Sequence, residues 1–397
     1  MLENGYFCPK LVKYMQIRSK LPDLETSIFS KMSALATQHQ AINLSQGFPN
    51  FETDPKLLDL CQFYLQKGYN QYAPMIGLPA LTAVLSQKIA NLYGQTFAPA
   101  TEITLTAGAT QAIFCAIAAF CQTGDEVIMV EPAYDCYAPA IQLTGAKSVS
   151  YVLKADENWR IDWAKMAALV NEKTAMIIIN SPHNPTGSIL KKEDLQQLEM
   201  LVKGKNILVL SDEVYEHLTF DGEMHESILK YPKLKKQSLA VFSFGKTLHA
   251  TGWKIGYIVG DEALMREFRK VHQYNVFSVN TPFQHAIADY LQDENVYSGL
   301  ADFVQQKRDY WLNLIKNTQL KPLICEGTYF QNVDYSAISQ QKDTDFAIWL
   351  TEAIGVATIP LSVFYNKENA PAQHLIRICF AKTAATLDKA AQNLAKI

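Results

Sequence analysis

The sequence lacks several features that would place it in a common class of protein. Its seven cysteines form no C-x-x-C pair and are odd in number, which argues against a zinc site and against a disulfide framework. Lysine and arginine total 36 against 39 for aspartate and glutamate, so we expect no basic nucleic-acid surface. No stretch approaches the ~18 uninterrupted apolar residues that a membrane helix needs.

The start of the chain shows no targeting signature. Charged residues are scattered between Met1 and Lys20, and no apolar segment of the kind found in secretory signal peptides separates them. Together with the cysteine pattern, this predicts a protein of the reducing cytoplasm.

Two nucleotide-binding signatures are also missing. No G-x-G-x-x-G follows an expected strand, and the triplet Gly245-Lys246-Thr247 has Ala240 where a Walker A loop needs glycine. Nucleotide binding is therefore not favoured, and no metal site is predicted.

What the sequence does contain is a large α/β pattern. At 397 residues and 48% hydrophobic composition, the chain can bury a sizeable core. Short apolar runs alternate with helical patterns, which is typical of βαβ units and a mainly parallel sheet. The expected strands are Glu102–Thr106, Glu126–Val130, Ser148–Leu153, Ala175–Ile179, Ile207–Leu210, Leu239–Phe242 and Ile255–Val259. The expected helices are Thr110–Phe120, Trp163–Asn171, Lys192–Lys203 and Leu264–Tyr274.

The pattern changes from about Thr281 onward. We expect one long helical region, then a strand, a helix, a strand and a final helix, with the first four at His285–Ile315, Thr328–Asp334, Phe346–Ile354 and His374–Phe380. The sequence therefore predicts a large domain over residues 51–280. Residues 1–50 and 281–397 would form an N-terminal arm and a smaller α+β domain.

Polar residues follow the expected strands directly. Ligands of open parallel sheets bind beyond the carboxyl ends of the strands, so these residues are candidates for a common site. They are Gly108-Ala109-Thr110, Tyr134, Asn180 to Gly187, Ser211 to Tyr215, and Ser243 to Thr247.

Lys246 and Asp212 carry the strongest chemical signal. A lysine among Phe242, Phe244 and Leu248 loses hydration, and its neutral amine becomes a nucleophile, although most lysines simply reach solvent. A carboxylate at the end of an apolar strand is costly unless it meets a cation, and one economical cation is a protonated pyridine nitrogen. An aldehyde cofactor of that kind needs a Schiff-base lysine and an acid.

The remaining requirements of such a cofactor are an anion cradle and a stacking ring. The turn Gly108-Ala109-Thr110 precedes an alanine-rich helix, whose free N–H groups favour a phosphate, and Tyr134 can supply the ring. Each also has a plain structural reading, since Thr110 could be an ordinary N-cap and Tyr134 a core residue.

These motifs together resemble one family. Asn184-Pro185-Thr186-Gly187, Ser211 to Tyr215, and Ser243 to Thr247 with Thr251 to Tyr257 resemble the fold-type I, class I/II aminotransferases that depend on pyridoxal phosphate. The flanking segments, Ile42 to Pro49, Asn70 to Pro74, Phe277 to Pro282 and Ile376 to Ala381, are most similar to the bacterial methionine aminotransferase branch, which lies near the kynurenine and glutamine transaminases.

The resemblance implies a role for each candidate residue. Lys246 holds pyridoxal 5'-phosphate as a Schiff base, Asp212 pairs with its ring nitrogen, and Tyr215 with Asn184 binds its phenolic oxygen. The ring stacks on Tyr134. Ala109 and Thr110 hold the phosphate at the Gly108 turn, together with Ser243 and Lys254. Tyr72 of the partner subunit also reaches this phosphate, which implies a homodimer with shared sites. Arg377 grips the substrate carboxylate, helped by Asn184 and Gly47.

The implied reaction is a ping-pong transamination between an amino acid and a 2-oxo acid, with Lys246 moving the proton. No second arginine obviously binds a distal carboxylate, so we expect apolar or aromatic donors, methionine first, in a pocket that Phe29, Phe48, Phe277 and Phe364 could line. A cysteine-S-conjugate β-lyase or a kynurenine–oxoglutarate transaminase would use the same residues. A pyridoxal-phosphate-binding regulatory protein is disfavoured because no DNA-binding domain precedes the pattern.

Overall fold

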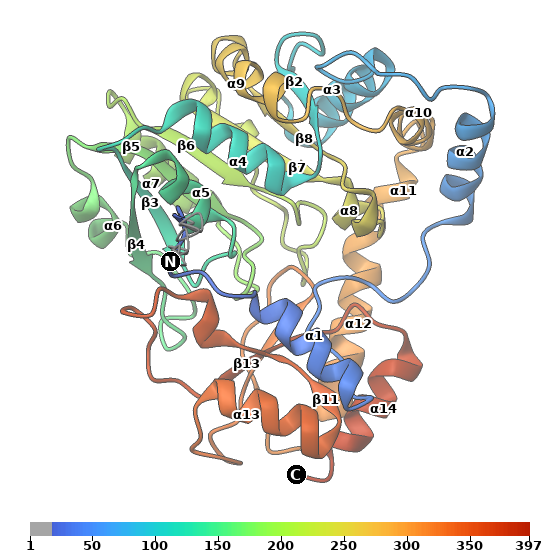
Figure 1. Cartoon of the computed structure of the whole chain (residues 1–397), viewed down its shortest axis with the longest axis vertical. Helices are drawn as coiled ribbons and strands as arrows, with labels where there is room; N and C mark the ends of the chain where they lie inside the picture. The colour runs from blue at the N-terminus through green and yellow to red at the C-terminus, as the bar shows by residue number, and fades with distance from the viewer. Residues whose placement is uncertain (1–17) are drawn as a thin grey trace, which may run out of the picture.

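The computed structural model describes residues 18–397. Its larger part, at the top of Figure 1, is a sheet covered by helices on both faces, and its smaller part, below, contains the first helix and the C-terminal elements. The predictions that concern residues 1–17, including the missing targeting signature and the state of Cys8, lie outside the described residues.

The large sheet has seven strands. Only β8 runs against its neighbours, and the other strands all point the same way, which confirms the predicted α/β class with a mainly parallel sheet. All the predicted strands are present to within two residues at either end. In spatial order the strands are β2 (Ile103–Thr106), β8 (Gly256–Gly260), β7 (Ser238–Ser243), β6 (Leu208–Asp212), β5 (Thr174–Asn180), β3 (Glu126–Glu131) and β4 (Lys147–Val152).

The central strands are apolar throughout because both faces of the sheet are buried. Successive side chains of a strand point to opposite faces, so Ile177 and Ile179 of β5 join one core cluster, whereas Met176 and Ile178 join the other. The first cluster packs under α3 (Pro79–Tyr93) and α7 (Lys192–Val202). The second packs under α4 (Ala109–Phe120), α5 (Tyr137–Thr144) and α9 (Glu262–Asn275).

The long helical region expected over 285–315 is present, but the structure divides it into three helices. They are α10 (Thr281–Tyr290), α11 (Asn295–Ser298) and α12 (Leu300–Ile315). Gly299 lies between α11 and α12 and forms a cap of both, as expected of a residue that interrupts helices readily. Within residues 18–397, no helix combines the length and the apolar character needed to cross a membrane.

The smaller part is built around a second sheet. In spatial order it contains β12 (Ile359–Pro360), β13 (Leu375–Cys379), β10 (Phe330–Asp334) and β9 (Lys321–Pro322). A separate parallel pair joins β1 (Ile42–Asn43) to β11 (Val356–Ala357), so the N-terminal segment is fixed to the C-terminal part. The smaller part also contains the helices α1 (Ile28–Gln38), α13 (Asp343–Trp349) and α14 (Ala384–Leu394). Two further helices pack against helices already described: α2 (Pro55–Gln66) contacts α10, and α6 (Trp163–Leu169) contacts α7. The exact limits of the two domains stay a prediction.

A buried ionic cluster lies behind the strand that carries Asp212. The Lys88 Nζ of α3 donates to Glu216 at 2.5 Å and to the Tyr257 hydroxyl at 3.1 Å, and the Tyr93 hydroxyl also donates to Glu216. Lys88 and Glu216 are almost completely buried. Because Glu216 directly follows Tyr215, the cluster holds the segment beyond β6 in place.

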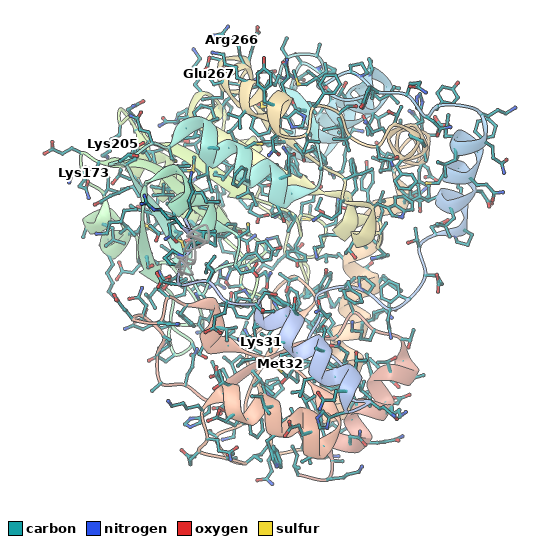
Figure 2. The ribbon with its side chains drawn as sticks, in the orientation of Figure 1. Lys31, Met32, Lys173, Lys205, Arg266 and Glu267 are labelled. Carbon is teal, nitrogen blue, oxygen red and sulfur yellow. The ribbon has the colours of Figure 1, made fainter. Side chains whose placement is uncertain are left out.

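Replacing Lys88 with methionine should strongly destabilise the protein. The substitution leaves Glu216 as a buried charge without its cation, which costs about 3–5 kcal/mol of unfolding free energy. The matched control is Lys31→Met on the outer side of α1 (Figure 2), whose pair with Glu25 is exposed, so its loss should stay below about 0.5 kcal/mol. Urea unfolding of the two variants measures the difference, and equal losses would contradict the role of the cluster.

Candidate active site

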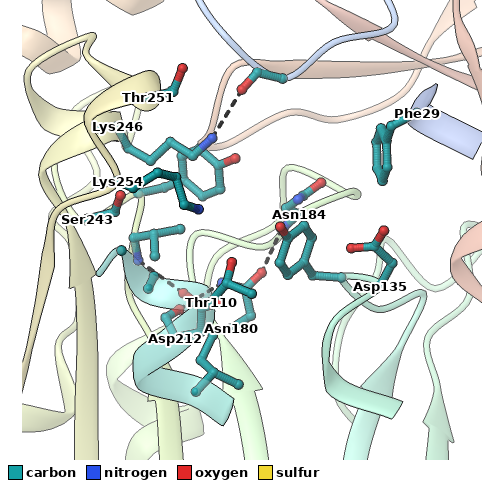
Figure 3. Close-up of a pocket in the computed structure, with 18 of the residues that line it drawn as sticks. Phe29, Thr110, Asp135, Asn180, Asn184, Asp212, Ser243, Lys246, Thr251 and Lys254 are labelled. Atoms are coloured by element: carbon teal, nitrogen blue, oxygen red, sulfur yellow. Dashed lines mark hydrogen bonds between the residues drawn. The ribbon is translucent and has the colours of Figure 1, made fainter. Parts of the chain in front are cut away.

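One cavity of about 320 Å³ opens at the carboxyl edge of the large sheet. Figure 3 shows its lining, with Lys246, Lys254 and Ser243 on one side and Asp135 with Phe29 on the other. The structure brings almost all of the predicted site residues to this cavity. They are Gly47, Gly108, Ala109, Thr110, Tyr134, Asn184, Asp212, Tyr215, Ser243, Lys246, Lys254 and Arg377.

Asp212 is a buried carboxylate at the end of β6. It accepts a hydrogen bond of 2.6 Å from the Tyr137 hydroxyl and one of 3.3 Å from the Val214 N–H. Burial raises its pKa to about 6, although the hydrogen bond from Tyr137 opposes this shift. Within residues 18–397, Asp212 makes no ion pair, so the site presents a negative charge that lacks a cation.

Lys246 lies in the short helix α8 (Phe244–Thr247) that follows β7. Its Nζ donates to the Tyr329 hydroxyl at 2.9 Å and to the Gly47 carbonyl at 3.1 Å. Its pKa is lowered to about 8, chiefly by burial, and the nearby positive charges of Arg377 and Lys254 contribute to this shift. Near neutral pH a useful fraction of this amine is therefore neutral and nucleophilic.

A corner of the cavity is built to hold an anion. Gly108, at φ 77°, is the N-cap of α4, and it lines the cavity together with Ala109 and Thr110, the first residues of a helix whose N-terminal N–H groups favour an anion. Lys254 adopts a left-handed backbone with φ 54°, which is strained for a non-glycine residue. A Cβ on Gly108 would lie 3.3 Å from the Lys254 Nζ, so glycine leaves the space beside that ammonium open. Ser243 and Thr110 line the same corner.

Arg377 is a third cation of the cavity, and it is buried on β13. Its Nη1 donates to Asn184 Oδ1 at 2.7 Å and its Nη2 to the Ser45 carbonyl at 3.2 Å. The guanidinium carbon lies 3.9 Å from the centre of the Phe330 ring and 4.8 Å from that of Phe364. Burial lowers its pKa to about 10, so the group remains charged at neutral pH.

The guanidinium retains capacity to bind a ligand. Its Nε is buried and finds no hydrogen-bond partner in the part of the chain that the structure describes. A buried donor without a partner is costly, and a carboxylate in the cavity would satisfy it. Arg377 is therefore a buried residue of the cavity wall with a donor available to an anion, rather than the solvent-facing residue that its place on a strand also allowed.

Two tyrosines complete the predicted set within this chain. Tyr215 is buried, its ring meets that of Tyr329 edge-on at 5.2 Å, and burial raises its pKa. The Lys246 Nζ lies 5.6 Å from the centre of the Tyr215 ring. Tyr134 lines the opposite wall, and burial raises its pKa as well.

Tyr72 is the one predicted site residue that does not line the cavity of its own chain. It is 82% exposed, and its ring packs edge-on against the half-exposed Phe277 at 5.4 Å. A site role for this residue therefore depends on a second subunit. Of the four phenylalanines considered for the substrate pocket, only Phe29 is among the lining residues.

Sequence reasoning missed several groups that contact the key side chains. Tyr137 lies three residues after Tyr134 at the start of α5, a helical spacing that could have paired the two. Asn180 is among the candidate residues that follow the expected strands, but the sequence assigned it no contact; its Nδ2 donates a hydrogen bond of 2.7 Å to the Asp212 carbonyl. Tyr329 and Phe330 lie near the start of β10, and no local signal indicated that they face Lys246 and Arg377.

Comparison with known proteins agrees with this geometry. The family described as aminotransferase class I and II matches residues 39–394. The chain is 49% identical to the methionine aminotransferase of Escherichia coli over 96% of its own length and 98% of the relative's. It is 36% identical to the kynurenine–oxoglutarate transaminase of Dictyostelium discoideum, over 97% and 98% of the two chains.

Solved structures give the same result. An Escherichia coli protein with a methionine aminotransferase function superposes with a TM-score of 0.94 at 48% identity, covering 97% of this chain and all of the other. An aspartate aminotransferase from Thermus thermophilus superposes with a TM-score of 0.87 at 26% identity, covering 96% and 100%. The chain therefore belongs to the class I and II aminotransferase family, and it is a transaminase of fold type I.

Proposed function

We propose that this transaminase uses pyridoxal 5'-phosphate and transfers the amino group of an apolar amino acid, methionine first, to a 2-oxo acid. The observation that carries the proposal is that one cavity holds both a buried carboxylate at Asp212, which makes no ion pair within residues 18–397, and a lysine of lowered pKa at Lys246. A cofactor with a cationic ring nitrogen and an aldehyde fits both groups.

The other lining groups fit the rest of that cofactor. The N-terminus of α4, Ser243 and Lys254 would hold its phosphate, while Tyr134 would lie against the ring. Tyr215 and Asn184 would donate hydrogen bonds to its phenolic oxygen. Asp212 would hold a proton on the ring nitrogen, because a carboxylate in a dry site raises the pKa of a neighbouring base.

Bound pyridoxal phosphate supplies an electron-withdrawing ring that stabilises negative charge at the substrate Cα. The chain's own residues do the remaining work. Arg377 and Asn184 fix the substrate carboxylate, which orients the Cα–H bond toward Lys246. Once its amine is free, Lys246 moves the proton as general acid and base, a task suited to a group whose pKa is about 8.

The lining of the cavity supports the substrate preference. Within the described residues, its cations are Lys246, Lys254 and Arg377, and the first two are committed to the cofactor. Arg377 can bind one carboxylate, so a substrate side chain meets no cation of its own. Phe29 and Phe330 line the space near Arg377 and suit an apolar side chain.

The proposal includes a homodimer with shared sites and a cytoplasmic location. In this proposal Tyr72 reaches the phosphate corner of the partner subunit, and its exposed ring, which does not line the cavity of its own chain, is free to do so. The six cysteines in residues 18–397 are free thiols, and all except Cys136 are buried, which supports a reducing compartment.

Borohydride should fix the cofactor to Lys246. Reduction of the holoenzyme followed by peptide mapping is expected to label this residue alone, and Lys246→Ala should lose the label together with at least ~10³-fold of the transamination rate, because the general acid–base and the covalent anchor disappear together. Lys205→Ala, an exposed position, serves as the control. A label on any other lysine would refute the assignment.

Asp212→Asn should stabilise the cofactor-free protein above pH 6. The carboxyl has a pKa of about 6 in the folded chain against an ordinary 3.8. Well below pH 3.8 the group is protonated in both states and costs nothing. Its penalty grows between pH 4 and 6 and then stays constant at about 3 kcal/mol. Urea unfolding at pH 4 and pH 8 tests this, with exposed Asp156→Asn as control. A variant less stable than wild type at pH 8 would contradict it.

Methionine should be a far better donor than aspartate. The second carboxylate of aspartate would be desolvated in the cavity without a cation, and the cost of an unpaired charge leads us to expect a kcat/KM at least about 100-fold lower. Steady-state rates with both donors, and with kynurenine as a third, measure the preference. A kcat/KM for aspartate equal to that for methionine would overturn the substrate assignment while leaving the cofactor assignment intact.

A further inference from the structure

Five charged side chains line the cavity within residues 18–397, and one has no task in the proposed reaction. Lys246, Lys254, Arg377 and Asp212 are all assigned to the cofactor or to the substrate carboxylate. The fifth is Asp135.

The surroundings of Asp135 leave its carboxylate available to a ligand. The residue follows Tyr134 in the turn between β3 and α5, and it faces the cavity from the side opposite Lys246 (Figure 3). In the described part of the chain its side-chain oxygens have no hydrogen bond to another residue and no ion pair. Burial raises its pKa, and the charge of Arg377 opposes that shift.

The position of Asp135 relative to Arg377 determines what it meets. A substrate held by its α-carboxylate on Arg377 and by its amino group near Lys246 must direct its side chain into the remaining space. Phe29 packs near Arg377, with the guanidinium carbon 5.4 Å from its ring centre, and bounds that space. Asp135 lines the same side of the cavity.

We propose that Asp135 is a specificity-determining residue that rejects any amino donor or 2-oxo acid acceptor bearing a second carboxylate. The inference rests on the proposed function, and it identifies the substrate class as monocarboxylic for both half-reactions, since both use the same site. The cavity would then reject a second carboxylate in two ways, because it lacks a second cation for that group and because Asp135 repels it. Many binding sites achieve specificity through such a repulsive group.

Like charges explain the size of the effect. Asp135 is exposed where it lines the cavity, and two carboxylates that meet near a protein surface still repel each other by more than they would in bulk water. A substrate amide in the same place instead has N–H groups that can donate hydrogen bonds to the carboxylate oxygens of Asp135. Glutamine and glutamate are therefore the most direct pair of probes, because they have the same shape and differ in this charge.

The experiment measures the rate of the first half-reaction of the holoenzyme with glutamine and with glutamate at pH 8. Asp135→Asn removes the charge at constant shape, Asp135→Glu retains it, and Asp156→Asn removes an exposed charge outside the cavity. We expect Asp135→Asn to lower the glutamine-to-glutamate ratio of kcat/KM by about tenfold or more. The other two variants should keep a ratio within about threefold of wild type.

Two results would overturn the inference. An unchanged ratio in Asp135→Asn would show that the carboxylate does not discriminate, and a loss of discrimination in Asp135→Glu equal to that in Asp135→Asn would show that shape rather than charge decides. The cofactor absorbance of each variant is measured first. Loss of that absorbance in the wild-type protein would instead refute the proposed function, so the two failures are distinguishable.

Discussion

The site depends on the shared direction of the strands in the large sheet. Because every strand except β8 points the same way, their carboxyl ends meet at one edge, and β8 begins at that edge as well. Residues from six separate segments therefore converge without any long loop. The register of β5 against β6 sets Asn180 level with Asp212, so hydrogen bonding between neighbouring strands fixes the positions of the polar groups to within a residue.

This convergence places charged side chains in a buried region, where the loss of hydration makes a charge unfavourable. Asp212 has a raised pKa, and Lys246 and Arg377 have lowered ones, each chiefly because of burial. A fold tolerates such groups when the surrounding structure determines their positions and a ligand satisfies them. The Lys88–Glu216 cluster behind β6 is a satisfied ionic group, and it stabilises the segment that carries the unsatisfied one.

The two parts of the molecule meet at Arg377. This residue belongs to the smaller sheet, yet it donates to Asn184, which follows a strand of the large sheet, and to Ser45, which follows β1. Its aromatic neighbours, Phe330 and Phe364, also come from the smaller part. Under the proposed function, substrate recognition would require both parts to be docked, whereas the proposed cofactor groups lie almost entirely in the larger part.

The sequence by itself determined the seven strands of the large sheet, the α/β class and nearly all of the polar residues at the strand ends, because apolar runs and the residues that follow them are local properties of the chain. It did not determine the breaks in the 285–315 helical region or the contacts of Tyr137, Tyr329 and Phe330. Nor did it single out Asp135, whose significance comes from its place on the wall of the cavity. Only the tertiary structure decided these features, because they depend on which distant segments share a wall of one cavity, and local spacing carries no information about that.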